Sequence, residues 1–318
     1  MSKCKKTSIG GQALIEGIMM LGPEKSAIAV RKESGDIELK VENITKLTDK
    51  YKILGIPFLR GIFGMYESLK RGFAALNFAS SIAISEIDEE PTKFEKWLEA
   101  KFGSRAVESI VMGIATVFGI AIPIGLFILL PTLLSGLLDL LPTAKAFLED
   151  WTIVRNLIEG ILRIVIFLIF MFSVSRMKDM KRVFSYHGAE HKSIFCYEAG
   201  EELTVENVRK FSKEHPRCGT SFMFSVMVIS VLVFSTVSWS NVIIRMVLRL
   251  ALLPVVVGIS YEVNRFIGRH DNWFTRIVRA PGIWFQTFTT FEPDDSMIEI
   301  AIAALREVIP ENKEADNW

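Results

Sequence analysis

The stretch from Ala106 to Leu141 contains no lysine or arginine and is dominated by apolar side chains. A helix that crosses a bilayer needs roughly 20 such residues, so this run is long enough to cross and to continue beyond the far side. Pro123 and Pro131 interrupt the run. We therefore predict a kinked span followed by a segment at the far interface, which places this part of the chain in a membrane.

Three more apolar runs follow, and each has about the length of a membrane span. They cover residues 153–175, 220–239 and 241–260. Only a few residues separate the last two runs, so we expect them to form an antiparallel hairpin across the membrane. Half of the residues are hydrophobic while 23% are charged, which indicates membrane helices joined to polar parts of comparable size.

The distribution of basic residues predicts the orientation. The segment between the second and third runs is rich in lysine and arginine. The segment between the first and second runs, on the other side of the membrane, has only Lys145 beside two acids. Because basic residues stay on the cytoplasmic side, both termini and the basic segment are expected to be cytoplasmic. The basic residues are Arg176, Lys178, Lys181, Arg182, Lys192, Arg209, Lys210, Lys213 and Arg217.

Charge, cysteines and the N-terminus exclude other classes of protein. A net charge of +1 without a basic patch argues against a nucleic-acid partner. The three cysteines, Cys4, Cys196 and Cys218, are too few for a disulfide framework and are expected to be reduced thiols on a cytoplasmic face. The basic N-terminus has no apolar segment directly behind it, so it is not a secretory signal peptide.

The expected fold is mainly α: a polytopic membrane protein with about four transmembrane helices, a small N-terminal β-hairpin element and cytoplasmic helices. The alternation over residues 26–42 predicts the hairpin. Residues 53–80 are expected to form an amphipathic helix on the membrane surface, and Ser296 with Glu299 to form a capping box. The predicted parts are 1–50 (β element), 51–105 (surface helices), 106–175 (spans one and two), 176–219 (histidine- and cysteine-bearing loop), 220–260 (spans three and four) and 261–318 (C-terminal region).

The segment "YHGAEHK" holds the strongest candidate for chemistry. His187 and His191 stand four residues apart, so on a helix both imidazoles leave the same face and can reach one metal ion. Glu190 lies beside His191, in the inverted form of a zinc-protease motif, where it could act as a base and not as a ligand. In "HPRCGTSF", His215 and Cys218 offer a second pair of ligands.

We predict a zinc site made by His187, His191 and Cys218, with His215 or Glu262 as alternates. Cys196 and Glu198 are further potential ligands nearby. Four protein ligands would close a structural site, whereas three would leave a position for water, and the sequence leaves both open. A third alternative also stands: the histidines could be surface residues of a basic linker, paired with neighbouring glutamates.

Charged residues also lie inside the predicted spans. Arg155, Glu159 and Arg163 recur every four residues in the second span, as do Arg245 and Arg249 in the fourth. Such charges are costly at membrane depth and face a helix-bundle interior or water. Packing or snorkelling explains Arg155 and Arg245, while Arg163 and Arg249 better fit a site for an anionic headgroup or substrate. Glu16, between two glycines, fits either a tight packing contact or a site role.

Four blocks of the sequence resemble those of a known family. "GGQALIEGIMMLGP", "YHGAEHK", "HPRCGTSF" and "EPDDSMIEIAIAAL" occur in the order found in the YqhQ-like bacterial membrane proteins, which carry the domain of unknown function 1385. The resemblance covers nearly the whole chain. It implies a multi-pass protein of the bacterial cell (inner) membrane and a predicted metal-dependent enzyme without an established substrate.

The leading hypothesis is therefore a zinc-dependent hydrolase at the cytoplasmic surface of the lipid bilayer. Glu190 would take a proton from a water that the zinc activates. A peptide or a lipid-linked molecule would suit this location as the substrate. The alternative is a non-enzymatic transport, channel or assembly factor whose cytoplasmic part is stabilised by a structural metal.

Overall fold

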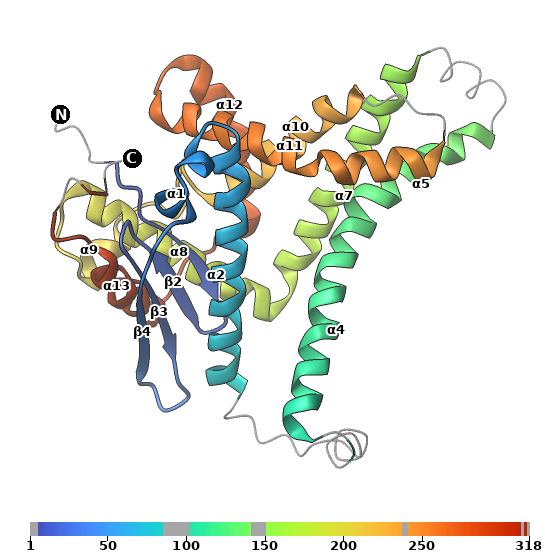
Figure 1. Ribbon diagram of the computed structural model, residues 1–318. Helices are drawn as coiled ribbons and strands as arrows, with labels where there is room; N and C mark the ends of the chain where they lie inside the picture. Colours follow the sequence, from blue (N-terminus) through green and yellow to red (C-terminus); the bar gives the residue numbers. More distant parts are fainter. Residues whose placement is uncertain are drawn as a thin grey trace. The chain divides into compact units, whose positions relative to one another are not determined.

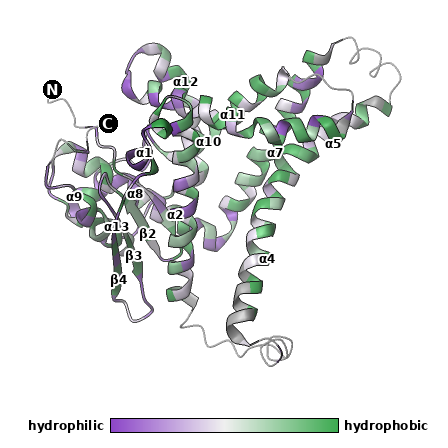
Figure 2. Cartoon of the chain, viewed as in Figure 1, coloured by the Kyte–Doolittle hydropathy of each residue, from purple (hydrophilic) through white to green (hydrophobic). Residues whose placement is uncertain are grey.

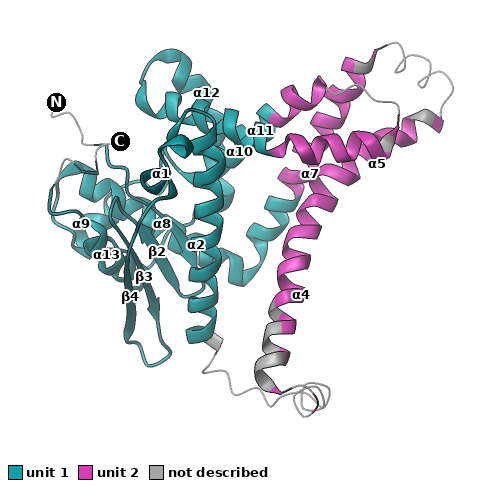
Figure 3. Cartoon of the chain, in the orientation of Figure 1, with its two compact units in different colours: residues 1–86, 170–229, 254–318 teal, residues 87–169, 230–253 magenta. Residues whose placement is uncertain are grey.

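The structure, a computed structural model, divides the chain into two compact units (Figures 1 and 3). It describes residues 6–84, 101, 103–140, 151–236, 241–312 and 315–316. Unit 1 comprises residues 1–86, 170–229 and 254–318, and unit 2 comprises residues 87–169 and 230–253. The candidate metal residues all fall in unit 1, and the charged residues of the predicted spans fall in unit 2.

Unit 1 contains a four-stranded antiparallel sheet in the order β1-β2-β3-β4. The strands are β1 (Gly10–Leu14), β2 (Gly17–Leu21), β3 (Lys25–Arg31) and β4 (Ile37–Asn43). The pairing of β3 with β4 confirms the predicted hairpin. The β1–β2 hairpin was not predicted, because "GGQALIEGIMML" is apolar on both sides of its turn and shows no clear alternation.

Both faces of the sheet are covered by helices at strands β2 and β3, as Figure 1 shows, whereas β4 is largely exposed. Ile18, Met20 and the small side chains of β3 face α8 (Lys178–Ala199) and α13 (Asp295–Val308). Met19 and Ile28, which alternate with them, face α2 (Leu59–Ile84) on the other side. Successive strand residues point to opposite faces, so a sheet that is buried on both sides reads as a continuous apolar run.

Helix α2 corresponds to the helix predicted over residues 53–80. It follows α1 (Leu47–Lys50) and the 3-10 turn η1 (Lys52–Gly55). Ala75 and Ala79 are fully buried against the sheet, so one face of α2 has a packing role within unit 1. Its place at a membrane surface stays a prediction.

The basic segment predicted as a loop is largely helical. Helix α8 is followed by the short α9 (Val205–Arg209), and α8 ends at Gly200, whose φ of 75° is the left-handed conformation favoured at helix ends. Tyr186 and Ala189 on α8 are fully buried in the core of unit 1. The segment is therefore part of the folded body of unit 1.

The start of α13 also differs from the prediction. The residue that caps the helix is Asp294, whose carboxylate accepts a hydrogen bond from the Met297 amide at 3.0 Å. Ser296 donates to the same carboxylate. Glu299 pairs with Arg31 on β3 and so joins the helix to the sheet. The prediction of a Ser296–Glu299 capping box was wrong, because a carboxylate two residues earlier takes the capping role.

The four apolar runs are helical over most of the residues that the structure describes in them. The first comprises α4 (Ser104–Ile124), the π-helical turn η2 (Gly125–Leu129), α5 (Leu130–Gly136) and η3 (Leu137–Leu140), so the helical path continues through both prolines. The others are α7 (Thr152–Arg176), α10 (Gly219–Ser235) and α11 (Val242–Arg269), and α12 (Trp273–Thr289) follows.

Among the described residues, three helical stretches are long and apolar enough to cross a membrane: Gly113–Gly136, Ile153–Arg176 and Ile243–Arg269. Figure 2 shows hydrophobic residues along most of their length. Helix α10 is a shorter apolar helix, near the lower limit for a span. A mainly helical chain with a small N-terminal sheet is therefore confirmed, and a fourth span remains a prediction.

Candidate metal centre

Three potential ligands meet in unit 1. His187 and His191 project from α8, and Cys218 stands just before α10. One ligand atom of each residue lies within 4.8 Å of the others, and the distance from His187 Nε2 to Cys218 Sγ is 3.1 Å. The two rings on α8 have centroids 4.4 Å apart, as expected for positions one helical turn apart. The fold thus brings together the three residues that the sequence analysis placed first.

Main-chain carbonyls hold both imidazoles in the orientation that a metal requires. The Nδ1 atom of His187 lies 2.8 Å from the Thr289 carbonyl oxygen, and that of His191 lies 2.5 Å from the Lys213 carbonyl oxygen. A carbonyl only accepts hydrogen bonds, so each Nδ1 carries a proton and Nε2 is the ring nitrogen of each histidine that can bind a metal. The Nε2 atom of His191 is buried without a hydrogen-bond partner. Metal-binding histidines commonly show this arrangement.

The electrostatics favour a thiolate at Cys218. Burial alone would raise the pKa of the thiol, but the imidazoles of His187 and His191 outweigh burial and hold the pKa well below its usual range. For His187, burial alone would lower the pKa of the imidazole. The Cys218 sulfur outweighs burial and raises this pKa to about 9. In the absence of an ion, the sulfur and this imidazole therefore form a charge pair. A thiolate is the form in which cysteine binds metals.

Glu190 is buried beside this cluster, and burial raises the pKa of its carboxyl group. The Gly11 amide of β1 donates a hydrogen bond to the carboxylate, while Oε2 is buried without a partner. Gly11 has no side chain at a point where a Cβ atom would lie 2.9 Å from Glu190 Cδ. The edge of the sheet thus fixes one carboxylate oxygen and leaves the other without a protein donor.

A small cavity of about 100 Å³ joins Glu190 to the three potential ligands. Its lining includes Glu190, His191 and Cys218 together with main chain of Gly10 and Gly11. A cavity of this size holds water and a small reacting group. The arrangement can therefore present a bound ion and a carboxylate to the same small molecule.

His215 lies in a second layer. Its Nδ1 atom accepts a hydrogen bond from the Arg217 amide at 3.3 Å, so its Nε2 carries the proton and faces Glu198 Oε2 at 3.6 Å. Glu198 is buried and also binds the Arg217 guanidinium and the Thr7 amide. The structure therefore gives both His215 and Glu198 partners other than a metal, and places His215 outside the ligand group.

Three other candidates from the sequence lie away from the cluster. Glu262 accepts hydrogen bonds from the Arg60 side chain at 2.7 Å and from the Phe58 amide at 3.1 Å. Cys196 is in the core of unit 1, where burial raises its pKa to about 11. Glu16 occupies the β1–β2 turn with a φ of 51° and pairs with Arg182 on α8. The structure thus does not bring Glu262 or Cys196 to the three clustered ligands, and Glu16 forms an ion pair between the sheet and α8.

Several supporting residues were not foreseen. Gln286 of α12 accepts a hydrogen bond from the His215 amide and donates one to the His215 carbonyl, each at 2.8 Å. Gly188 allows the chain after α12 to pass close to α8, because a Cβ there would lie 2.1 Å from the Phe291 carbonyl oxygen. The carbonyls of Thr289 and Lys213 carry no side-chain signal in the sequence. Only Gln286, a polar residue in an aromatic stretch, could have been noticed.

The charged residues of the predicted spans form a separate buried cluster in unit 2. The Arg249 guanidinium pairs with the Glu159 carboxylate, and each of the two side chains is 1% exposed. Arg249 also donates to Thr132 Oγ1 at 2.5 Å, and Ser135 donates to Glu159 at 2.6 Å. Arg245 approaches Glu159 at 3.7 Å. Each of these groups therefore lies in an internal polar network.

Arg163 belongs to the same unit but binds neutral groups. Its Nε donates to the Phe127 carbonyl at 2.7 Å, and its NH1 donates to Ser230 Oγ at 3.1 Å. Pro131 has no N–H with which to satisfy the Phe127 carbonyl four residues earlier, so the guanidinium supplies a donor at that point. The contacts of Arg163 are those of a structural residue, and a site for an anion at Arg163 and Arg249 stays a hypothesis.

Comparisons with known proteins point to one family. The family model described as "Protein of unknown function (DUF1385)" matches residues 56–311. The chain is 33% identical to the "Uncharacterized protein YqhQ" of Bacillus subtilis (strain 168), over 97% of this chain and 95% of that protein. No solved structure matches significantly. All three clustered ligands lie within the matched range.

Proposed function

Since the chain belongs to the DUF1385 family, whose description assigns no activity, we propose from its geometry that it is a zinc-dependent hydrolase acting at the cytoplasmic surface of the membrane. One observation carries the proposal. Two imidazoles converge through Nε2 on a thiol, the Nε2 of His191 is buried without a partner, and a buried carboxylate with one unpartnered oxygen lines the same cavity. This is the combination of metal ligands and base that hydrolysis requires.

The donor set fits zinc. Two imidazole nitrogens and one thiolate sulfur are common zinc ligands, and sites with three protein ligands leave a position for water or substrate. The orphaned Nε2 of His191 lacks a partner that an ion would supply. The carbonyls that accept from each Nδ1 provide the outer hydrogen bonds found around such sites.

Each residue has a role in the proposed reaction. His187, His191 and Cys218 would hold the ion, which when bound supplies a Lewis acid that lowers the pKa of water to about 7. Glu190 would accept a proton from the attacking water through its unpartnered oxygen and return it to the leaving group. The Gly11 amide would keep that carboxylate in place.

The substrate class follows from the proposed location. A peptide or a lipid-linked molecule at the membrane surface could present a scissile bond to the site. The small volume of the cavity, about 100 Å³, also favours a second candidate function, in which the metal only stabilises unit 1 of a transport, channel or assembly factor. Pockets for whole small-molecule ligands are typically larger, at roughly 300–1,000 Å³.

Metal substitution tests the proposed centre. The purified full-length protein should contain about one zinc ion per chain, and its cobalt(II) form should show an intense thiolate-to-metal absorption band, because Cys218 is a ligand. The band should be absent from Cys218→Ser and unchanged in Cys196→Ser, since Cys196 lies in the core of unit 1. Absence of stoichiometric metal, or an unaltered band in Cys218→Ser, would contradict the proposed centre.

We also propose that the metal centre and both termini are cytoplasmic and that four helices cross the bacterial cell membrane. The distribution of basic residues supports this orientation. Native Cys196 is fully buried and therefore unsuited to labelling, whereas Glu206 on α9 is exposed. A Glu206→Cys thiol should react with an impermeant maleimide only after permeabilisation of the cells. Labelling in intact cells would overturn the orientation.

A further inference from the structure

Helix α12 carries an apolar stripe on the side that faces away from the rest of unit 1. Trp273 is 75% exposed, Ile277 61% and Trp284 52%. Residues advance by roughly 100° along a helix, so these three fall within an arc of about 40°. Gly282, Gln286 and Thr289 lie about opposite to them and are all buried. The helix is thus more apolar on its outer side than a helix facing water should be.

The inner side of α12 is attached to the metal centre. Gln286 bonds both main-chain groups of His215, and the Thr289 carbonyl accepts from His187. Gly282 packs directly on Ser221, where a Cβ atom would lie 2.9 Å from the Ser221 Cβ. Because these contacts fix the rotation of the helix about its axis, the outward direction of the stripe follows from the fold.

The start of α12 lies close to the end of a membrane-crossing helix. Helix α11 contains the candidate span Ile243–Arg269, and only residues 270–272 separate it from α12. A connection of this length spans at most roughly 14 Å. If α11 crosses the membrane, as the proposed function has it, α12 must begin at or near the cytoplasmic interface. Phe266, near the end of α11, is exposed as well.

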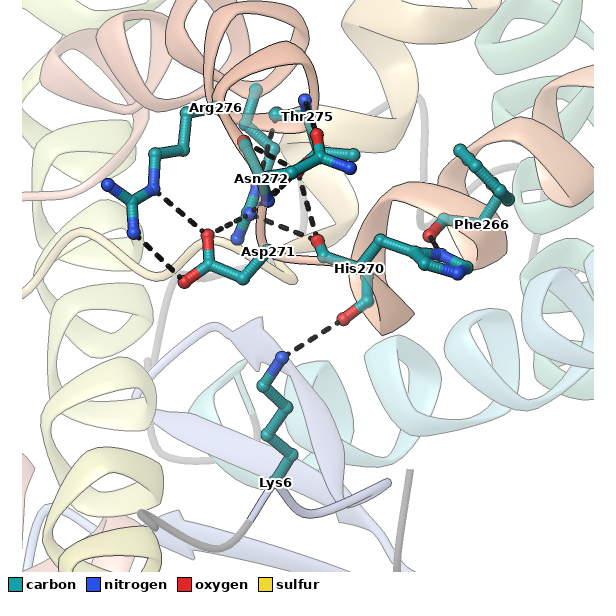
Figure 4. A network of polar contacts seen from close by, with 9 residues as sticks. Lys6, Phe266, His270, Asp271, Asn272, Thr275 and Arg276 are labelled. Carbon is teal, nitrogen blue, oxygen red and sulfur yellow. Dashed lines mark hydrogen bonds and ion pairs between the residues drawn. The ribbon is translucent and has the colours of Figure 1, made fainter.

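The connection between the two helices is well ordered by polar contacts, as Figure 4 shows. Asn272 caps α12 by a reciprocal pair of hydrogen bonds with Thr275. Asp271 pairs with Arg276 at 3.1 Å, and the Lys6 ammonium donates to the Gly268 carbonyl at 3.4 Å. The turn therefore holds α12 in a set direction relative to the end of α11.

A basic residue, Arg276, flanks the stripe at about 80° from its centre, whereas Arg279 lies nearer the inner side and its side chain is 14% exposed. An open depression of about 510 Å³ lies beside it, and its lining combines guanidinium groups with apolar side chains. Asp271 is the single acid among these lining residues and Arg276 and Arg279 pair with it, so one positive charge remains in excess. Exposed Arg269 adds another near the turn. The lining residues are Asp271, Arg276, Arg279, Ala280, Ile283 and Trp284.

We propose that α12 lies in the plane of the cytoplasmic leaflet, with Trp273, Ile277 and Trp284 in the lipid and Arg276 at the level of anionic phosphate headgroups. Tryptophan is enriched at membrane interfaces, and arginine favours anionic lipids. A helix with its side chains is about 10–12 Å across, so His187 and His215 lie roughly that far from the stripe. The metal centre thus sits just beneath the headgroups, within reach of a membrane-associated substrate.

Spin labels in nanodiscs test the placement. The full-length protein with the substitutions Cys4→Ser and Ile277→Cys is spin-labelled and reconstituted into nanodiscs of phosphatidylethanolamine and phosphatidylglycerol. Accessibility to oxygen, which concentrates in lipid, is compared with accessibility to a water-soluble nickel chelate. Two labelled positions serve as references. Val247→Cys, on the exposed side of the span in α11, is the lipid reference, and Glu206→Cys, exposed on α9, is the water reference. The protein without an added cysteine corrects for labelling of Cys196 and Cys218.

The label at position 277 should resemble the one at 247, with an oxygen-to-nickel ratio several-fold above that at 206. A high nickel accessibility at 277 together with lipid exposure at 247 would overturn the interfacial helix and leave the membrane placement of the chain intact. A label at 277 that neither reagent reaches would show a second copy or another protein on the stripe and would also overturn the proposal. Nickel accessibility at 247 would overturn both the span and the interfacial helix.

Discussion

The Glu190→Gln protein is expected to keep its metal and its melting temperature while losing activity by a factor on the order of 10² to 10⁴. Glutamine preserves the shape of the side chain, and its amide oxygen can still accept from the Gly11 amide. It cannot accept a proton from water. Metal content and thermal unfolding of the purified protein, together with complementation of a strain that lacks the gene, measure the three properties side by side.

The ligand variants should behave differently from Glu190→Gln. Removal of an imidazole or of the thiol, as in His191→Ala or Cys218→Ala, should release the metal and with it the free energy that metal binding contributes to folding. Glu201→Gln is a matched control, since Glu201 is exposed just beyond the end of α8. It should equal the wild type in metal content, melting temperature and complementation.

These variants separate the two candidate functions. With a purely structural metal, Glu190→Gln should complement fully, and the ligand variants should fail because the protein is degraded. A metal-loaded, stable Glu190→Gln protein that complements fully would therefore reject the hydrolase. Loss of complementation with metal and stability retained would support it, because no structural role of Glu190 would then account for the defect.

The Glu159→Gln protein is expected to lose roughly 3–5 kcal/mol of folding free energy, because the change leaves the buried Arg249 guanidinium without its counter-charge. Arg245, at 3.7 Å from the same carboxylate, loses part of its electrostatic partner as well. The measurement is denaturant-induced unfolding of the full-length protein in detergent, followed alongside its accumulation in the membrane. An unfolding midpoint equal to that of the wild type would contradict this account of the cluster.

A double variant provides the control for Glu159. Glu159→Gln with Arg249→Met removes both charges and should be more stable than the sum of the two single effects by roughly 0.5–3 kcal/mol. The protein that remains folded should still bind metal, because the ligands His187, His191 and Cys218 all belong to unit 1. Strict additivity of the two substitutions would show that the ion pair has no energetic coupling.

The sequence by itself determined the elements whose signals are local. Apolar runs such as residues 153–175 formed helices, because the composition of a single segment decides whether it can be helical and span a bilayer. The β3–β4 hairpin followed from alternation around a polar turn. His187 and His191 could be paired for the same reason, since a helix places residues four apart on one face. Each of these inferences required contacts only between neighbours in the chain.

Tertiary structure decided which distant groups complete the site. Cys218 lies beside the two histidines, whereas Glu262 pairs with Arg60 and Cys196 is buried in the core of unit 1. Nothing in the residue types or their spacing distinguishes these outcomes. The orientation of the imidazoles depends on the carbonyls of Thr289 and Lys213, which have no side-chain signal. Such contacts depend on how separate elements pack, and packing is not encoded at a fixed spacing.

The same limit explains the elements that were missed or misjudged. The extent of α8 was not predicted within the segment described as a loop between spans, where only the spacing of His187 and His191 indicated a helix; its buried face packs on the sheet and on α13. The β1–β2 hairpin was hidden because both of its faces are covered, and burial on both sides removes the alternation that marks a strand. The sequence therefore set which side chains can carry the chemistry, and long-range packing alone selected the ones that meet.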